Sequence, residues 1–330
     1  MKMHHFLVLS AAAGMIAAGA VATTAGAAPT AHQAAAGTYS LNVLPDQGES
    51  AIYNFIETAK TSIDVTMYEL RDTTVTSDLV AKQQAGVQVR VILDAQHTSV
   101  NGAAYSALQA GGVAVTYSSS AFTYTHQKTI TVDGAESFIS TGNLDSKYYA
   151  TSRDYGVFDT DANDVSAIEA VFAADFAKTS ITPGDGDDLV WSPTDSQSQL
   201  DSLINSATKT LDVEQEEFSD PTLVGDVVAA AQRGVTVRVV AEDENGSYDS
   251  ELNQVTSAGG TVTTYTSSTG YYIHAKAIIV DGSKIFLGSE NFSTNSLTNN
   301  RELGLIISDP TVLSGVEQAF TADFNKTSGN

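Results

Sequence analysis

The stretch His126–Asp133 reads HQKTITVD, and the stretch His274–Asp281 reads HAKAIIVD. Both fit the pattern His-x-Lys-x4-Asp, and the second lies 148 residues after the first. An asparagine and then a carboxylate follow each stretch at the same 148-residue offset: Asn143 and Asp154, then Asn291 and Glu302. Because chance rarely places two such constellations in constant register, this repetition indicates a duplicated functional unit.

The duplication extends beyond the motif. Residues 85–91 read AGVQVRV and residues 233–239 read RGVTVRV, while FAADF at 172–176 matches FTADF at 320–324. From about residue 56 to residue 180 the copies align without insertion or deletion. We therefore expect two homologous domains, residues 38–183 and 184–330, joined by a turn-rich acidic linker.

Helical and strand patterns alternate within the first copy. Amphipathic segments occupy residues 49–59, 76–85 and 103–110, and apolar or β-branched runs occupy residues 62–68, 87–93 and 113–117. This alternation predicts an α/β fold in which each domain has a mixed, mostly parallel sheet flanked by helices.

The motif itself has a strand pattern. Residues two apart on a strand face the same side, so we expect His126 to project with Lys128 and His274 with Lys276. Asp133-Gly134 and Asp281-Gly282 are hairpin-turn dipeptides. We interpret Asp133 and Asp281 as structural residues of these turns.

The N-terminus has the pattern of a secretory signal peptide. Lys2 precedes an apolar run, and Ala25-Gly26-Ala27 provides a cleavage site. We expect a signal peptide at residues 1–27, a flexible Ala-rich leader at residues 28–37, and a secreted, extracellular protein. The chain has no cysteine, which excludes disulfides, thiol catalysis and Cys-ligated zinc.

The chain is strongly acidic, with 16 Lys and Arg against 39 Asp and Glu and a formal net charge of −23. Such a charge disfavours polyanionic partners, whose binding rests on clustered Lys and Arg. For a basic cleft the motif lysines are accompanied by scattered residues such as Lys147, Arg153 and Arg301. We interpret the acidic run at residues 214–217 as a solvated strand end and His97 as a loop residue without a catalytic role.

The motif residues suit phosphoryl chemistry. Imidazole can act as a nucleophile or a general acid near neutral pH, and lysine and asparagine donors can hold phosphoryl oxygens. The chain resembles the phospholipase D superfamily, whose signature is His-x-Lys-x4-Asp followed by a Gly/Ser-rich turn and Asn. The second copy has the full turn, Gly288-Ser289-Glu290-Asn291, whereas the first has Ser140-Thr141-Gly142-Asn143.

The resemblance implies two domains related by a pseudo-twofold axis, with the site at their interface. It implies that His126 attacks phosphorus to form a phosphohistidine and that His274 protonates the leaving alcohol, although the residues alone do not order the two. Asp154 and Glu302 would orient the histidines or serve in structural salt bridges. It requires neither metal nor cofactor. The phosphate would be held by Lys128, Asn143, Lys276, Ser289 and Asn291.

Three functions follow from these observations. The first is a secreted phospholipase D that hydrolyses glycerophospholipids at a membrane or micelle surface to phosphatidic acid and a head-group alcohol, with transfer to another alcohol as a second outcome. The second is a metal-independent endonuclease, and the third is an inactive binding protein, against which the intact motifs argue. Since both copies lie in one chain, we expect a monomer without an obligate protein partner. The aromatics Phe122, Tyr124, Tyr271 and Tyr272 could line a substrate mouth or pack against strands.

Overall fold

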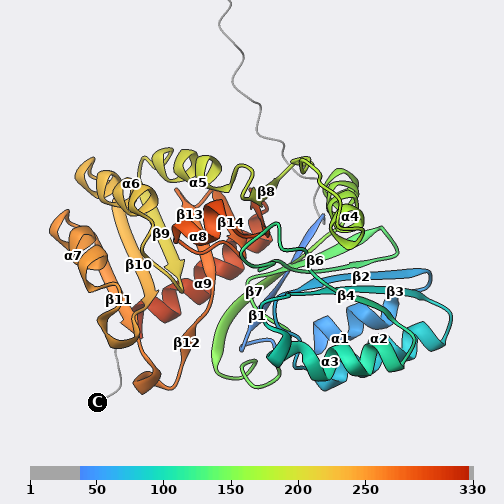
Figure 1. Ribbon diagram of the computed structural model, residues 1–330. Coiled ribbons are helices and arrows are strands. Elements are labelled where there is room, and N and C mark those ends of the chain that lie inside the picture. Colours follow the sequence, from blue (N-terminus) through green and yellow to red (C-terminus); the bar gives the residue numbers. More distant parts are fainter. Residues whose placement is uncertain (1–37, 327–330) are drawn as a thin grey trace, which may run out of the picture. The chain divides into compact units, whose positions relative to one another are not determined.

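The computed structural model describes residues 38–326, which form two sheets flanked by helices (Figure 1). The predicted signal peptide, residues 1–27, and the predicted leader, residues 28–37, lie outside the described residues. Within the described part, none of the helices has the length and apolar character needed to cross a membrane.

The first half forms a sheet with strand order β1-β7-β6-β5-β2-β3-β4. Figure 1 shows α1, α2 and α3 on one face of this sheet and α4 on the other. The strands are β1 (Tyr39–Leu44), β2 (Ser62–Met67), β3 (Gln88–Leu93), β4 (Ala114–Tyr117), β5 (Lys128–Val132), β6 (Glu136–Ser140) and β7 (Ser152–Asp159). The helices are α1 (Ser50–Thr58), α2 (Thr73–Gln84), α3 (Thr98–Ala110) and α4 (Ala162–Phe176).

The second half repeats this order as β11-β10-β9-β13-β14-β15-β8. Its strands are β8 (Leu189–Ser192), β9 (Thr210–Gln215), β10 (Thr236–Glu242), β11 (Thr261–Tyr265), β12 (Tyr272–Ile273), β13 (Lys276–Val280), β14 (Lys284–Gly288) and β15 (Glu302–Ile307). Its helices are α5 (Ser196–Asn205), α6 (Pro221–Gln232), η1 (Glu244–Gly246), α7 (Asp249–Ser257), η2 (Ser267–Thr269), α8 (Thr294–Thr298) and α9 (Pro310–Asn325).

Both sheets are mixed, as predicted, but antiparallel pairs outnumber parallel ones. In the first half only β2–β3 and β3–β4 pair parallel along the strand order, and in the second half only β9–β10 and β10–β11 do. The prediction of a mostly parallel sheet is therefore wrong. The motif strand returns directly through a hairpin, and each hairpin places antiparallel neighbours in the middle of the sheet.

Aspartate caps set the start of matching helices in the two halves. Asp72 caps α2 by accepting two backbone N–H groups, and Asp220 does the same for α6. Asp161 and Asp309 cap α4 and α9 in the same way. The cap explains why α2 begins at Thr73, three residues before the predicted start, because a side-chain acceptor satisfies N–H groups that the first turn leaves unpaired.

The turn after each motif strand is closed by its aspartate. Asp133 and Asp281 have φ values of 56° and 53°, and the glycine after each has φ 59°, as a two-residue hairpin requires. Asp133 accepts backbone N–H groups from residues 60–62 at 2.7–3.1 Å, and Asp281 accepts those of residues 208–210 at 2.7–3.1 Å. Both carboxylates thus attach the hairpin turn to the start of the neighbouring strand. They lie at the end of the motif strand that is opposite to the histidine.

The two halves share a core and exchange polar contacts. One cluster of buried apolar side chains combines strands of both sheets with α4 and α9, and α9 packs on β1. Arg153 pairs with Asp323 of the other half at 2.5 Å, and Arg301 pairs reciprocally with Asp175 at 2.9 Å. β12 also pairs with β7 of the first sheet. The residues between the sheets are therefore positioned by both halves.

Candidate active site

The motif histidines lie just before their strands. β5 and β13 begin at the motif lysines, so the prediction that each histidine shares a strand with its lysine is wrong by two residues. Instead the backbone N–H of His126 donates to the carbonyl of Arg301 (2.9 Å), and that of His274 donates to the carbonyl of Arg153 (3.2 Å). Each histidine is therefore held by the backbone of the opposite half.

The carboxylate that follows each motif contacts the histidine of the other half. Nδ1 of His126 lies 2.7 Å from Oε2 of Glu302, and Nδ1 of His274 lies 2.8 Å from Oδ1 of Asp154. A carboxylate at Nδ1 fixes the proton there and leaves Nε2 for chemistry. The sequence motif indicated orienting carboxylates, but it did not reveal that the pairs cross between the halves.

His126 is suited to be a neutral nucleophile. Burial and the nearby charge of Lys128 lower the pKa of His126 to about 4, even though Glu302 opposes this shift. Burial by itself would raise the pKa of Glu302, but its interactions with His126 and Lys128 outweigh burial and lower it. An ionised Glu302 beside a neutral imidazole leaves the Nε2 lone pair of His126 free to attack an electrophile.

One cavity of about 720 Å³ contains both histidines. Among the described residues, no lysine or arginine lines this cavity. Its wall includes five tyrosines and five carboxylates: Tyr68, Tyr148, Tyr149, Tyr271, Tyr272, Glu69, Asp145, Asp154, Glu216 and Glu217. The cavity is therefore aromatic and acidic at its surface, a lining that disfavours a long polyanion.

The two motif lysines are buried next to the histidines, and among the residues that the structure describes only Lys276 has a carboxylate partner. Each Nζ donates to the carbonyl of its own motif histidine, at 2.6 Å and 2.5 Å. Nζ of Lys128 lies 5.1 Å from the ring centroid of Tyr68, and burial together with Lys276 lowers the pKa of Lys128 to about 7. Nζ of Lys276 also donates to Glu216 at 2.6 Å.

Glu216 is part of this site, so its interpretation as a solvated strand end is wrong. Its side chain is only 19% exposed, and it accepts hydrogen bonds from Lys276 and from the hydroxyl of Tyr272, both at 2.6 Å. Its Oε2 lies 3.5 Å from Nε2 of His274. Burial raises its pKa, but His274 and Lys276 outweigh burial and hold that pKa well below its usual range. Glu214 is also wholly buried.

The asparagines of the two motifs line the cavity, and Ser289 does not. Within the described chain, the buried side-chain oxygens of Asn143 and Asn291 have no hydrogen-bond partner. The hydroxyl of Ser289 accepts the N–H of Leu303 at 3.2 Å, behind the cavity wall. We predicted Ser289 as a phosphate ligand, and the structure corrects this because the wholly buried hydroxyl lies between the N–H and the carbonyl of Leu303. Thr141, its counterpart, donates to Asp154.

Sequence reasoning missed the first-half residue that corresponds to Glu216. Tyr68 stands 148 residues before Glu216, and its ring centroid lies 4.5 Å from that of His126. The Tyr68 hydroxyl lies 3.0 Å from Nε2 of His97, whose Nδ1 lies 3.2 Å from Asp94. His97 thus contacts Tyr68 from its loop, an interaction that the sequence did not indicate. Extending the repeat offset to the ends of β2 and β9 would have revealed Tyr68 and Glu216.

The arginines considered for a basic cleft are not available. The side chains of Arg153 and Arg301 are each 3% exposed and bind Asp323 and Asp175. Lys147 is exposed, but its Nζ contacts the hydroxyl of Tyr148 at 3.2 Å. The charges of the two arginines are therefore used for packing the two halves together, and Lys147 remains at the surface.

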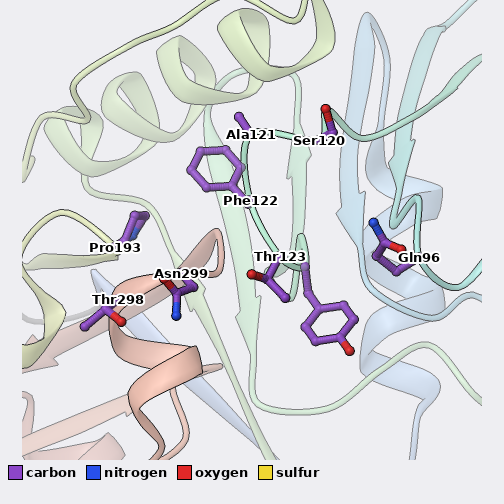
Figure 2. A pocket seen from close by; sticks show the side chains of 9 residues that line it. Gln96, Ser120, Ala121, Phe122, Thr123, Pro193, Thr298 and Asn299 are labelled. Carbon is purple, nitrogen blue, oxygen red and sulfur yellow. The ribbon is translucent and has the colours of Figure 1, made fainter.

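The four aromatics that flank the motifs divide between two cavities. Tyr271 and Tyr272 line the histidine cavity. Phe122 and Tyr124 line a second cavity of about 550 Å³, where Figure 2 shows the ring of Phe122 on the loop from Ser120 to Thr123, on the side toward Pro193. Neither motif histidine lines this second cavity.

The chain matches a family model described as cardiolipin synthase, PLD-like domain, at residues 52–176 and again at residues 200–324. A mitochondrial cardiolipin hydrolase of Xenopus tropicalis is 34% identical over 37% of this chain and 58% of its own length. A cardiolipin synthase of Listeria welshimeri is 26% identical over 61% of this chain and 48% of its own length. The chain thus spans about half the length of these relatives.

A solved structure supports the arrangement of the two halves. The phosphatidylserine synthase of Haemophilus influenzae superposes with a TM-score of 0.71 at 16% identity, covering 89% of this chain and 88% of that one. At 16% identity this similarity shows a shared fold, and the shared fold extends over both halves of the chain.

Proposed function

The chain belongs to the phospholipase D-like family over both of its halves, and on that premise we propose that it is a phosphodiesterase that hydrolyses glycerophospholipids to phosphatidic acid and a head-group alcohol. The observation that carries this proposal is the crossed pair of histidines: each is held at Nδ1 by a carboxylate of the opposite half, and both line one cavity.

The reaction has two displacements at phosphorus. Nε2 of His126 attacks phosphorus while the bond to the head-group oxygen breaks, and Nε2 of His274 gives its proton to that oxygen. Water then attacks the phosphohistidine, passes a proton to His274, and releases phosphatidic acid and free His126. Another alcohol in place of water gives transfer. Lys128, Lys276 and the two motif asparagines stabilise the charge that builds on the phosphoryl oxygens.

The lining of the cavity supports a phospholipid over a nucleic acid. A single phosphodiester at the histidines has the two motif lysines buried behind the cavity wall, while the rest of the substrate meets tyrosine faces and carboxylates. The ammonium group of a choline or ethanolamine head group suits such a lining, because aromatic faces and carboxylates both attract cations. A DNA strand would bring further phosphates against the same carboxylates.

We also propose that the reaction takes place at a membrane or micelle surface and that the protein is secreted. Secretion rests on the pattern of residues 1–27. A monomer suffices, because one chain supplies both histidines and both carboxylates.

The test offers the purified protein phosphatidylcholine vesicles and single-stranded DNA in parallel, with chelator present and with His274→Ala as the background control. We expect release of choline and phosphatidic acid, abolished in the variant, and intact DNA. DNA cleavage without choline release would overturn the lipid substrate in favour of the nuclease, and activity on neither would overturn the proposed function.

A further inference from the structure

The two reactive nitrogens face different neighbours, although their surroundings derive from one repeat. At the end of β2 the first half places Tyr68 against the ring of His126. At the same position after β9 the second half places Glu216, whose carboxylate lies 3.5 Å from Nε2 of His274. The 148-residue offset thus brings a neutral aromatic ring to one histidine and an anion to the other.

The position of Glu216 is fixed from several sides. It is held by Lys276 and Tyr272 at 2.6 Å and by Nδ2 of Asn291 at 3.4 Å. A carboxylate held so firmly remains beside the imidazole as charge changes there, at no cost of reorganisation. The polar and charged groups around His274 come from four elements of both halves: Asp154 of β7, Glu216 after β9 and Tyr272 of β12 lie next to its ring, and Lys276 of β13 donates to its carbonyl.

His126 has fewer anionic neighbours than His274. Its Nδ1 meets Glu302, but its other neighbours are the ring of Tyr68 and the ammonium of Lys128. In the described chain, no carboxylate other than Glu302 lies within ion-pair distance of His126. A positive charge on this ring therefore has one anionic partner, whereas on His274 it has two.

We propose that Glu216 is a positioning residue that keeps the proton on Nε2 of His274 and so divides the labour between the histidines, with His126 as nucleophile and His274 as acid. This inference rests on the proposed function. When the P–Nε2 bond to His126 forms and the bond to the leaving oxygen breaks, that oxygen receives the electron pair and then the proton from His274. In the second step His274 recovers a proton from water beside the same carboxylate.

The decisive experiment compares two substrates that differ in whether their leaving group must be protonated by a general acid. Phosphatidylcholine has an alkyl leaving group that must be protonated, whereas a p-nitrophenyl phosphodiester has a leaving group that departs as an anion. For Glu216→Gln we expect kcat/KM on phosphatidylcholine to fall about 10- to 100-fold, with a much smaller loss in the p-nitrophenol burst. The alkaline limb of the pH–rate profile should move to lower pH by about one unit, because the protonated ring has lost a neighbouring anion.

Three controls separate this role from a structural one. Glu216→Asp keeps the charge and should restore part of the lost activity and the alkaline limb. Glu251→Gln removes a negative charge on α7, away from the cavity, and should behave as the unaltered protein. Quenched single turnovers of the unaltered protein, followed by peptide mass spectrometry, should place the phosphoryl group on His126. This measurement does not depend on the folding of any variant.

The outcomes are distinct. Phosphorylation of His274, or equal losses on both substrates in Glu216→Gln with an unmoved pH profile, would overturn the role of Glu216 while leaving a phosphohistidine enzyme. Absence of any histidine adduct with either phosphodiester would instead overturn the proposed function itself.

Discussion

The two halves of the chain have the same frame and different catalytic surroundings. Arg90 binds Asp64 in the first half just as Arg238 binds Asp212 in the second, with Nε–Oδ1 distances of 2.7 Å in both. The aspartate caps and hairpin turns also match. Next to the histidines the halves differ: Tyr68 corresponds to Glu216.

This difference separates two kinds of constraint. Both halves need the same helix caps, hairpin turns and contacts with the other half. The residues that form these features therefore match at corresponding positions of the two halves. Under the proposed mechanism the two histidines need unequal electrostatic surroundings, because one must be neutral to attack and the other must carry a proton to give. The side chains that line the cavity supply that inequality.

Removing the histidines should give the largest effect and the sharpest contrast between the halves. His126→Ala and His274→Ala should each lower kcat by about a thousandfold or more on phosphatidylcholine, because each displacement needs both groups. Trapping of the covalent adduct with a p-nitrophenyl phosphodiester should distinguish them: His274→Ala should still form an adduct, and His126→Ala should form none. An adduct in His126→Ala would reverse the assignment.

The crossed carboxylates should give the next largest effect. Glu302→Gln and Asp154→Asn should each lower kcat about 10- to 100-fold, because the imidazole loses the partner that fixes its tautomer. Glu302→Gln should be the more severe, since Glu302 is wholly buried and also accepts from Ser296 and Asn300 at 2.6 and 2.9 Å. Steady-state kinetics at one pH, with circular dichroism as the folding control, would measure this, and a greater loss in Asp154→Asn would contradict it.

The reciprocal arginine pairs should affect stability. Arg153→Met should lower the free energy of unfolding by about 3–5 kcal/mol, because it leaves Asp323 buried without its partner. Arg301→Met should cost less, because Arg153 also donates to Leu44 and Asp46 of its own half. Urea denaturation would measure both values. Adding Asp323→Asn to Arg153→Met should recover part of the loss, and no recovery would show that the pair is not the cause.

The hairpin aspartates should give the smallest and most equal effects. Asp133→Asn and Asp281→Asn should each cost about 1 kcal/mol of stability after allowance for solvent screening. Backbone hydrogen bonds outweigh partial burial and lower the pKa of Asp133 to about 2. The stabilisation is therefore present above the ordinary carboxyl pKa and lost as pH falls through about 2. Thermal unfolding at pH 7 and at low pH would measure it, and unequal costs would show that the turns differ.

Much of the fold and part of the site were predictable from sequence. The repeat, the mixed sheets and the hairpins follow from patterns of local residues, and the motif identified both histidines and their carboxylates. The crossing of the pairs was not predictable, because β12 and the backbone of Arg301 bring together residues far apart in the chain. Glu216 was misjudged for the same reason: acidic residues at a strand end are usually solvated, and only the packed second half encloses this one.

The crossed pairs also bear on how such a site can change by mutation. If two identical chains formed this cavity, any substitution would appear on both of its sides, and neither histidine could acquire a neighbour of its own. Within one chain, each side of the cavity is encoded separately. A tyrosine beside one histidine and a glutamate beside the other are possible only under that condition, so fusion of the halves gives the active centre a freedom to vary that symmetry would forbid.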